Sequence, residues 1–252
     1  MTPKITGRPV DQGAKLFVMD EVDLPIGDDF LDLVRTLEGQ CESQTDEAIP
    51  MLGVKTPSTY RNLGNVLSLL DRLGSCFWGC QKGDHSVEYL AARAASHARA
   101  SLRLMRGGYY DEALTLARGV GELCNLLQLF VADRSELDEW RKLDERTRRT
   151  RFSAANVRTR LVEKSKLPIL VDQRRYGELS GFASHPDPKN NPQAHNPLGI
   201  PTQGAVFQEL GPFSAVRQVY VSCSGHGSGT WSSSRMRRWV WVRRSRTIPL
   251  VV

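Results

Sequence analysis

Apolar side chains recur every three or four residues along most of the first 211 positions, the spacing that places them on one face of a helix. Glycines interrupt this pattern, and Gly39, Gly74 and the pair Gly107 and Gly108 are expected to end successive helices. No strand-like alternation of useful length precedes residue 212. We therefore predict an all-α protein. The predicted helices cover residues 27–39, 56–74, 84–106, 109–131, 134–151, 153–167 and 170–185.

These helices are expected to form a compact bundle of six or seven helices between residues 28 and 185. The bundle domain is predicted to reach residue 211, where the apolar periodicity stops. Residues 1–27 are expected to form an extended N-terminal segment. Residues 212–252 are expected to form an irregular C-terminal tail.

The segment 109–131 is apolar around most of its circumference, which is typical of a helix that neighbours cover on most sides. We therefore predict that it is the central helix of the bundle. Its remaining edge carries polar side chains three or four positions apart, called the polar strip below. The polar strip consists of Asp111, Thr115, Arg118, Glu122 and Asn125.

The pair Arg118 and Glu122 within the polar strip has three interpretations. An exposed ion pair at this spacing stabilises a helix by about 0.2–0.5 kcal/mol, but the favourable order places the acidic residue first. A buried network would fix how the central helix meets its neighbours, because a buried charge requires partners. A binding or catalytic site would use Arg118 to hold an anionic group. In either of the last two cases the strip should face the last helix of the domain, near Tyr176 or His185.

The net charge of +6 is concentrated at one end of the chain. Residues 213–252 contain seven arginines and no lysine or acidic residue, so the other 27 basic residues nearly balance all 28 acidic ones. The same segment contains three of the five tryptophans, behind a run rich in serine and glycine. The helical domain is therefore almost neutral, and the tail carries the whole excess of positive charge.

Two interpretations of the tail differ in whether its sequence has been selected. Arginines that neutralise phosphates and tryptophans that stack on bases would suit an arm for RNA or another nucleic acid. A tail rich in Arg, Ser, Gly, Trp and Val without Lys, Asp, Glu or Asn is also what a GC-rich gene yields when it is translated out of frame. A frameshift near Pro212 would have replaced a final packing helix. The candidate nucleic-acid-binding residues are Arg237, Arg238, Trp239, Trp241 and Arg243.

The cysteines do not predict a disulfide framework or a metal centre. There are five, an odd number, and they are scattered along the chain, as expected of reduced thiols. Cys76, Cys80 and His85 form a weak zinc pattern, but structural zinc usually requires two close ligand pairs. We therefore expect no metal and no cofactor. The absence of a long apolar run and of a signal-peptide pattern favours a cytoplasmic protein that does not cross a membrane.

Residues 85–200 carry three short motifs that resemble those of a family. An Arg-x3-Glu motif, Arg118 to Glu122, precedes a Tyr-x3-Ser motif, Tyr176 to Ser180, and a His-x2-Pro motif that begins at His185. This pattern loosely resembles HEPN-like and abortive-infection-type helical bundles of bacteria. The resemblance implies a nucleic-acid-directed enzyme and a homodimer, with Arg118, Glu122, Tyr176, Ser180 and His185 as candidate catalytic residues. The Arg-x4-6-His motif of HEPN ribonucleases is not matched, since the spacing from Arg93 to His97 leaves only three residues between them.

Two classes of function therefore follow from the sequence. A non-catalytic helical interaction module requires only an apolar face, and we favour this class. The alternative is a HEPN-like ribonuclease or toxin that acts in phage defence, which requires clustered Arg, His and Glu side chains.

Overall fold

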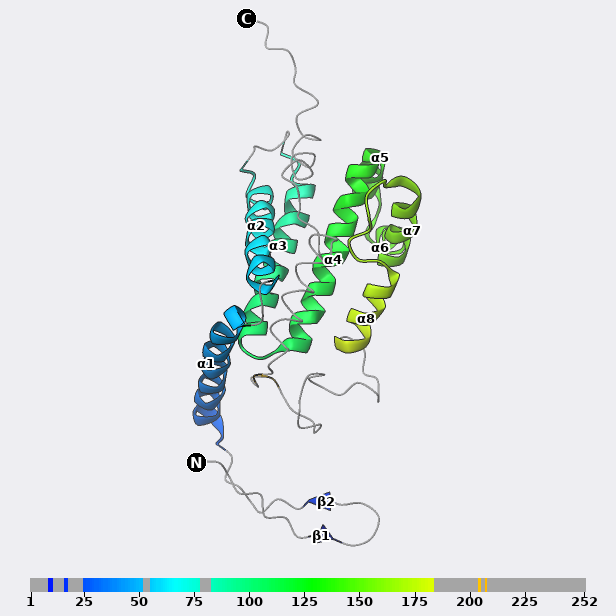
Figure 1. Ribbon diagram of the computed structural model, residues 1–252. Coiled ribbons are helices and arrows are strands. Elements are labelled where there is room, and N and C mark those ends of the chain that lie inside the picture. The colour runs from blue at the N-terminus through cyan, green and yellow to red at the C-terminus, as the bar shows by residue number, and fades with distance from the viewer. Residues whose placement is uncertain are drawn as a thin grey trace, which may run out of the picture.

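The computed structural model describes residues 9–10, 16–17, 25–51, 55–77, 83–183, 204 and 207. These residues confirm the prediction of an all-α bundle (Figure 1). A short antiparallel pair, β1 (Pro9–Val10) and β2 (Leu16–Phe17), precedes the helices. The helices within the described ranges are α1 (Gly27–Met51), α2 (Lys55–Gly74), α3 (Ser86–Arg106), α4 (Tyr110–Ala132), α5 (Arg134–Lys142), α6 (Glu145–Arg151), α7 (Ala154–Lys164) and α8 (Gln173–Ala183).

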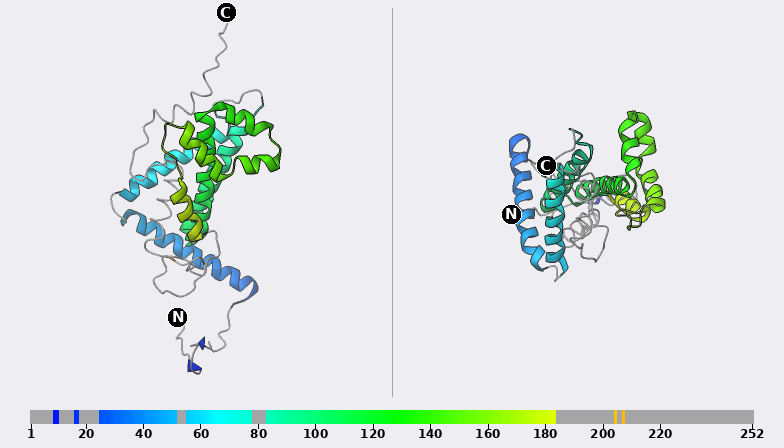
Figure 2. Two further views of the ribbon diagram at one scale, coloured as in Figure 1. Left: turned by 90° about the vertical axis from the view of Figure 1, so that its right-hand side faces the viewer. Right: turned by 90° about the horizontal axis from the view of Figure 1, so that it is seen from above.

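Helix α4 lies at the centre, with α2 and α3 on one side and α5 to α8 on the other (Figures 1 and 2). Its side chains Val120, Cys124 and Leu127 are buried, as the periodicity of segment 109–131 predicts. Leu116 is only half-buried. The apolar face of α4 therefore forms the core of the bundle, because it contacts helices on two opposite sides.

Small side chains bring α3 close to α4. Ala91, Ala94, Ala95 and Ala98 of α3 are almost completely buried, so the two backbones approach without large groups between them. The hydroxyl of Ser101 is also buried there and donates a hydrogen bond of 2.7 Å to the carbonyl oxygen of Ala113. The alanine-rich composition of segment 84–106 thus has a packing role.

The core divides into two clusters along α4. The first joins its N-terminal half to α2 and α3 through Leu63, Ala98 and Val120, among others. The second surrounds Leu129 at its C-terminal end, together with Val157 and Leu161 of α7. Successive turns of one helix therefore hold the two sides of the bundle together.

The predicted end of the first helix is wrong. Gly39 lies inside α1, which continues to Met51. A glycine in a helix interior costs only about 1 kcal/mol relative to alanine. Beyond Gly39, the side chains of Cys41 and Thr45 are buried. Glu42 forms an ion pair with Arg103, and Asp46 forms one with Arg106. Tertiary contacts therefore extend the helix past a local stop signal.

The charged segment 134–151, predicted as one helix, forms the two helices α5 and α6. Leu143 is extended, and the Asp144 carboxylate accepts a hydrogen bond from the backbone N–H of Thr147, which caps a new helix. Asp133 caps α5 in the same way, and hydrogen bonds from Lys164 and Ser135 lower the pKa of its carboxyl group to about 2. The capping residues explain why the described residues contain eight helices where six or seven were expected.

Among the described helices, α4 is long and apolar enough to cross a membrane by length and composition. The core helix of a soluble protein satisfies the same test, and just over half of the apolar window of α4 (56 %) is buried inside the bundle. Its composition is thus weak evidence for a membrane span.

Candidate functional site

Arg118 of the polar strip faces α8, as the sequence predicts. Nη1 of Arg118 donates a hydrogen bond of 3.3 Å to the hydroxyl oxygen of Ser180. The Arg118 guanidinium also lies over the ring of Tyr176, 5.4 Å from its centroid, within the range of a cation–π contact. The structure therefore brings Arg118 to Tyr176 and Ser180, which lie 58 or more positions after it in the chain.

Glu122 pairs weakly with Arg118. The Nε atom of Arg118 lies 3.4 Å from Oε1 of Glu122, yet this buried Nε has no aligned hydrogen-bond acceptor. The exposed fraction is 24 % for the Arg118 side chain and 36 % for that of Glu122. Water can therefore solvate Glu122. The pair is neither a free surface pair nor a fully buried one.

Arg158 of α7 is a member of this network that sequence reasoning missed. Its guanidinium lies 4.3 Å from the centroid of the Tyr176 ring, and its Nη2 donates a hydrogen bond of 2.6 Å to the side-chain oxygen of Gln173. Arg158 is buried. The only signal in the sequence that Arg158 is buried was its position on α7, beside Val157 and three residues before Leu161 on the apolar face. Two guanidinium groups therefore lie within cation–π distance of the Tyr176 ring.

Asn125, the last residue of the polar strip, holds the segment between α7 and α8. Its amide nitrogen donates a hydrogen bond of 2.8 Å to the backbone oxygen of Val171, and its amide oxygen accepts one of 3.2 Å from the Val171 N–H. Gly121 lies one turn earlier, where a Cβ atom would be 2.3 Å from Cγ2 of Val171. The absence of a side chain at Gly121 thus lets the Val171 segment approach α4.

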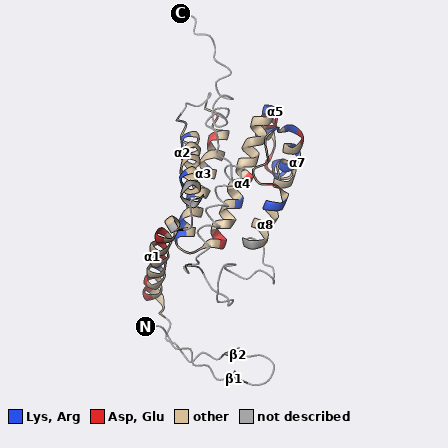
Figure 3. Ribbon diagram, viewed as in Figure 1, with Lys and Arg blue, Asp and Glu red and all other residues tan. Residues whose placement is uncertain are grey.

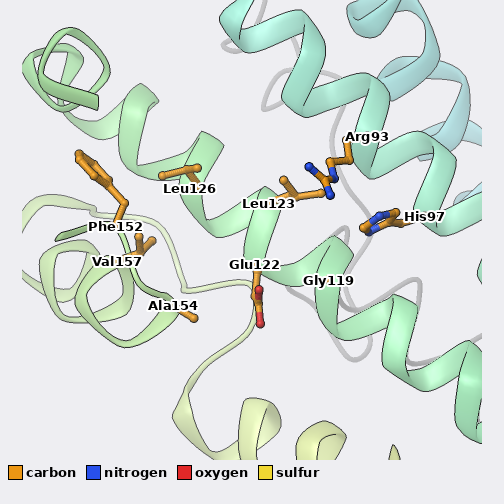
Figure 4. Close-up of a pocket in the computed structure, with 9 residues that line it drawn as sticks. All are labelled: Arg93, His97, Gly119, Glu122, Leu123, Leu126, Phe152, Ala154 and Val157. Atoms are coloured by element: carbon orange, nitrogen blue, oxygen red, sulfur yellow. The ribbon is translucent and has the colours of Figure 1, made fainter. Parts of the chain in front are cut away.

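A cavity of about 260 Å³ lies on another face of α4, between α3 and α7 (Figure 4). Arg93 and His97 of α3 and Glu122 of α4 line it. The remaining wall is mostly apolar. It consists of Gly119, Leu123, Leu126, Phe152, Ala154 and Val157.

His97 packs directly against the backbone of α4. Its Nδ1 atom is buried without a hydrogen-bond partner, and it would lie 3.0 Å from a Cβ atom at Gly119. Burial lowers the pKa of His97, the positive charge of Arg93 lowers it further, and Glu122 opposes the shift. The unperturbed value is already about 6.5, so His97 is mainly neutral at pH 7.

Arg93 carries a positive charge at this cavity and has no counter-ion among the described residues. Its side chain is exposed and makes no hydrogen bond or ion pair with any residue in the described part of the chain. Because guanidinium groups bind carboxylate and phosphate oxygens through parallel hydrogen bonds, Arg93 can hold an anionic group at the opening. The sequence singled out Arg93 and His97 only as a mismatch to the HEPN motif.

The N-terminal half of α1 presents a second candidate surface. Helix α1 lies at the edge of the bundle beside α2 and α3, and its first turns extend beyond them (Figures 1 and 2). The side chains of Phe30, Leu31, Leu33 and Leu37 are exposed there. Acidic residues flank them, and α1 is accordingly mostly red where it is charged in Figure 3.

Several predicted residues lie outside the described residues. These are His185 and the five candidate nucleic-acid-binding residues Arg237, Arg238, Trp239, Trp241 and Arg243. Cys80 of the weak zinc pattern also lies outside them, whereas Sγ of Cys76 is 3.2 Å from Nδ1 of His85. No group of three or more potential metal ligands occurs within the described ranges.

Replacing Arg118 with alanine is expected to lower the free energy of unfolding by about 1–2 kcal/mol, the size of one cation–π contact and one weak hydrogen bond. The effect is moderate because Glu122 stays accessible to water. Urea denaturation measures it. Arg174→Ala removes an exposed ion pair to Glu178 on α8 and should cost less than about 0.5 kcal/mol. Equal losses for the two variants would contradict a role for Arg118 in joining α4 to α8.

Comparison of the chain with protein-family models, with curated proteins and with solved structures finds no match. The resemblance to HEPN-like bundles therefore stays a prediction from the motifs.

Proposed function

We propose that this protein is a non-catalytic interaction module and that the N-terminal half of α1 is its docking surface. The docking surface consists of the exposed side chains of Phe30, Leu33 and Leu37 and of the acidic residues beside them. The proposed partner is a basic amphipathic helix of another protein.

The observation that carries this proposal is a stripe of side chains on one face of α1 that is buried at its C-terminal end and exposed at its N-terminal end. Phe30, Leu37, Cys41 and Thr45 lie on the same face of α1, because they are separated by nearly whole turns. The exposed fraction is 3 % at Cys41 and 0 % at Thr45, where α1 contacts the bundle, but 45 % at Phe30 and 37 % at Leu37. Contiguous exposed apolar side chains of this kind mark interaction sites. The stripe continues from the core to a surface that a partner can cover.

Charge decides which partner fits. Helix α1 contains seven acidic residues and one basic residue. Asp28, Asp29, Asp32 and Glu38 lie in the half that carries the docking surface. Two copies of such a helix would repel each other, whereas a helix with Lys or Arg beside an apolar face would match both the stripe and the charge.

The network around Arg118 supports the non-catalytic part of the proposal. Arg118 contacts both Tyr176 and Ser180, and Arg158 lies over the same Tyr176 ring. These contacts join α4, α7 and α8. A structural role in the bundle thus accounts for Arg118, Tyr176 and Ser180 without catalysis.

The double variant Phe30→Ser and Leu37→Ser is expected to weaken binding of a basic amphipathic peptide by about tenfold or more, since burying each apolar side chain contributes about 1.5–3 kcal/mol. The probe is a designed helix of Leu and Lys, followed by fluorescence anisotropy. A Leu and Glu peptide of the same pattern should not bind wild type. Binding of the basic peptide should also weaken as salt concentration rises.

Val162→Ser is the matched control, because Val162 is exposed on α7, remote in sequence from α1. It should bind the basic peptide like wild type. Equal affinity of the Phe30 and Leu37 double variant and wild type would overturn the proposal. Light scattering and peptide binding, on wild type and on a chain without residues 213–252, test two other occupants of the docking surface: a second copy of the protein and its own tail. If the double variant dissociates a homodimer, the second copy replaces the proposed partner. If the peptide binds only after the tail is removed, the tail replaces it.

A nucleic-acid-directed enzyme is the second candidate. The observation in its favour is that Arg93, His97 and Glu122 line one cavity. Cleavage of single-stranded RNA that His97→Ala abolishes, with unchanged peptide binding, would favour this candidate over the interaction module.

A further inference from the structure

We infer that the cavity between α3 and α7 binds a small monocarboxylic acid with an apolar body. Arg93 would hold the carboxylate, and the apolar wall of the cavity would cover the rest of the molecule. This site is separate from the docking surface on α1, which does not line the cavity.

The polar end of the cavity can hold one negative charge. Arg93 lines the cavity and has no hydrogen bond or ion pair to any described residue. Charge-assisted hydrogen bonds from a guanidinium group favour a charged ligand over a neutral one of the same shape. The burial that keeps His97 mainly neutral means that it adds little charge of its own.

The apolar end favours a hydrocarbon group. Leu123 and Leu126 of α4 lie on one side, and Phe152 and Val157 lie on the other (Figure 4). The volume of about 260 Å³ is slightly below the range of about 300–1,000 Å³ for sites that take drug-sized ligands. The occupant is therefore a small molecule with an apolar body, shorter than an extended polymer.

Glu122 restricts the charge of the ligand. Its side chain lines the cavity and has only a poorly aligned contact with Arg118. A second negative charge on the ligand would be repelled by Glu122, while a carboxylate held at Arg93 places one negative charge beside one positive charge. A monocarboxylate therefore fits better than a phosphate monoester, which carries more than one negative charge near pH 7.

Isothermal titration with three probes of one chain length tests this inference: octanoate, octyl phosphate and 1-octanol. Octanoate is expected to bind best. Arg93→Gln should weaken octanoate binding by about tenfold or more, the equivalent of a lost charge-assisted hydrogen bond, and should leave octanol binding nearly unchanged. Because the Arg93 side chain is exposed, the variant should fold like wild type, which circular dichroism can verify.

Arg99→Gln is the matched control. Arg99 lies on the same helix, pairs with Asp71 at 2.5 Å, and does not line the cavity. It should bind octanoate like wild type, and so should the Phe30 and Leu37 double variant. The inference is overturned if wild type does not bind octanoate at millimolar concentration, or if Arg93→Gln and Arg99→Gln bind it equally. Tighter binding of octyl phosphate than of octanoate would overturn the assignment to monocarboxylates. Since the double variant keeps the cavity, failure here is distinct from failure of the docking surface.

Discussion

Asn125→Ala is expected to lower the free energy of unfolding by about 2–6 kcal/mol, because it strands two backbone groups and each such buried group costs about 1–3 kcal/mol. The groups are the N–H and the carbonyl oxygen of Val171, which both bond to the Asn125 amide. Asn125 and Val171 are both buried, so water cannot easily replace the lost partner. Urea denaturation monitored by circular dichroism measures the change.

Asn156→Ala is the matched control for Asn125. Asn156 is exposed on α7, and its amide nitrogen donates one hydrogen bond of 2.8 Å, to the backbone oxygen of Thr150. This variant should lose less than about 1 kcal/mol, since water can satisfy the freed group. A loss of similar size for both variants would show that Asn125 does not hold the segment between α7 and α8.

Leu129→Ala is expected to cost about 2–5 kcal/mol of unfolding free energy, the range for a fully buried leucine. The exposed fraction of Leu129 is 0 %, and the side chain packs in the cluster with Val157 and Leu161. The alanine would leave a cavity where α4 meets α7. Thermal unfolding and urea denaturation of the same variant should both show the loss.

Val162→Ala is the comparison for Leu129, since it shortens an apolar side chain on α7 that is 72 % exposed. Its loss should stay within about 0.5 kcal/mol, as for other surface substitutions. If Leu129→Ala were equally mild, the second core cluster would not hold α7 against α4. The position of α8 would then depend on the first core cluster and on the contacts of Asn125 and Arg118.

Packing and hydrogen bonding have separate roles along α4. Leucines and alanines on its apolar face hold α3 and α7, whereas Asn125 and Arg118 on the polar strip hold the segment before α8 and α8 itself. Apolar contacts are not directional, but hydrogen bonds fix one relative position. If the two sites do not relax together, the losses of unfolding free energy expected for Leu129→Ala and Asn125→Ala should nearly add in the double variant.

The periodicity of apolar residues determined that the protein is all-α, that 109–131 is its central helix, and that Arg118 on its polar edge faces the last helix. These features follow from one repeat, because residues three and four apart share a helix face wherever the helix lies. A helix cap is likewise a local feature: the Ser153 hydroxyl accepts a hydrogen bond from the N–H of Asn156, three residues later, at the start of α7.

Only the tertiary structure decided which residues from different helices meet. Helix α1 passes Gly39 because Cys41 and Thr45 are buried against the bundle, and the same packing leaves Phe30 and Leu37 of one stripe exposed. Arg93 and His97 reach a cavity beside Glu122 because α3 packs on α4. Helical periodicity is a property of each segment alone, whereas the approach and offset of two helices depend on the sizes of side chains far apart in the sequence.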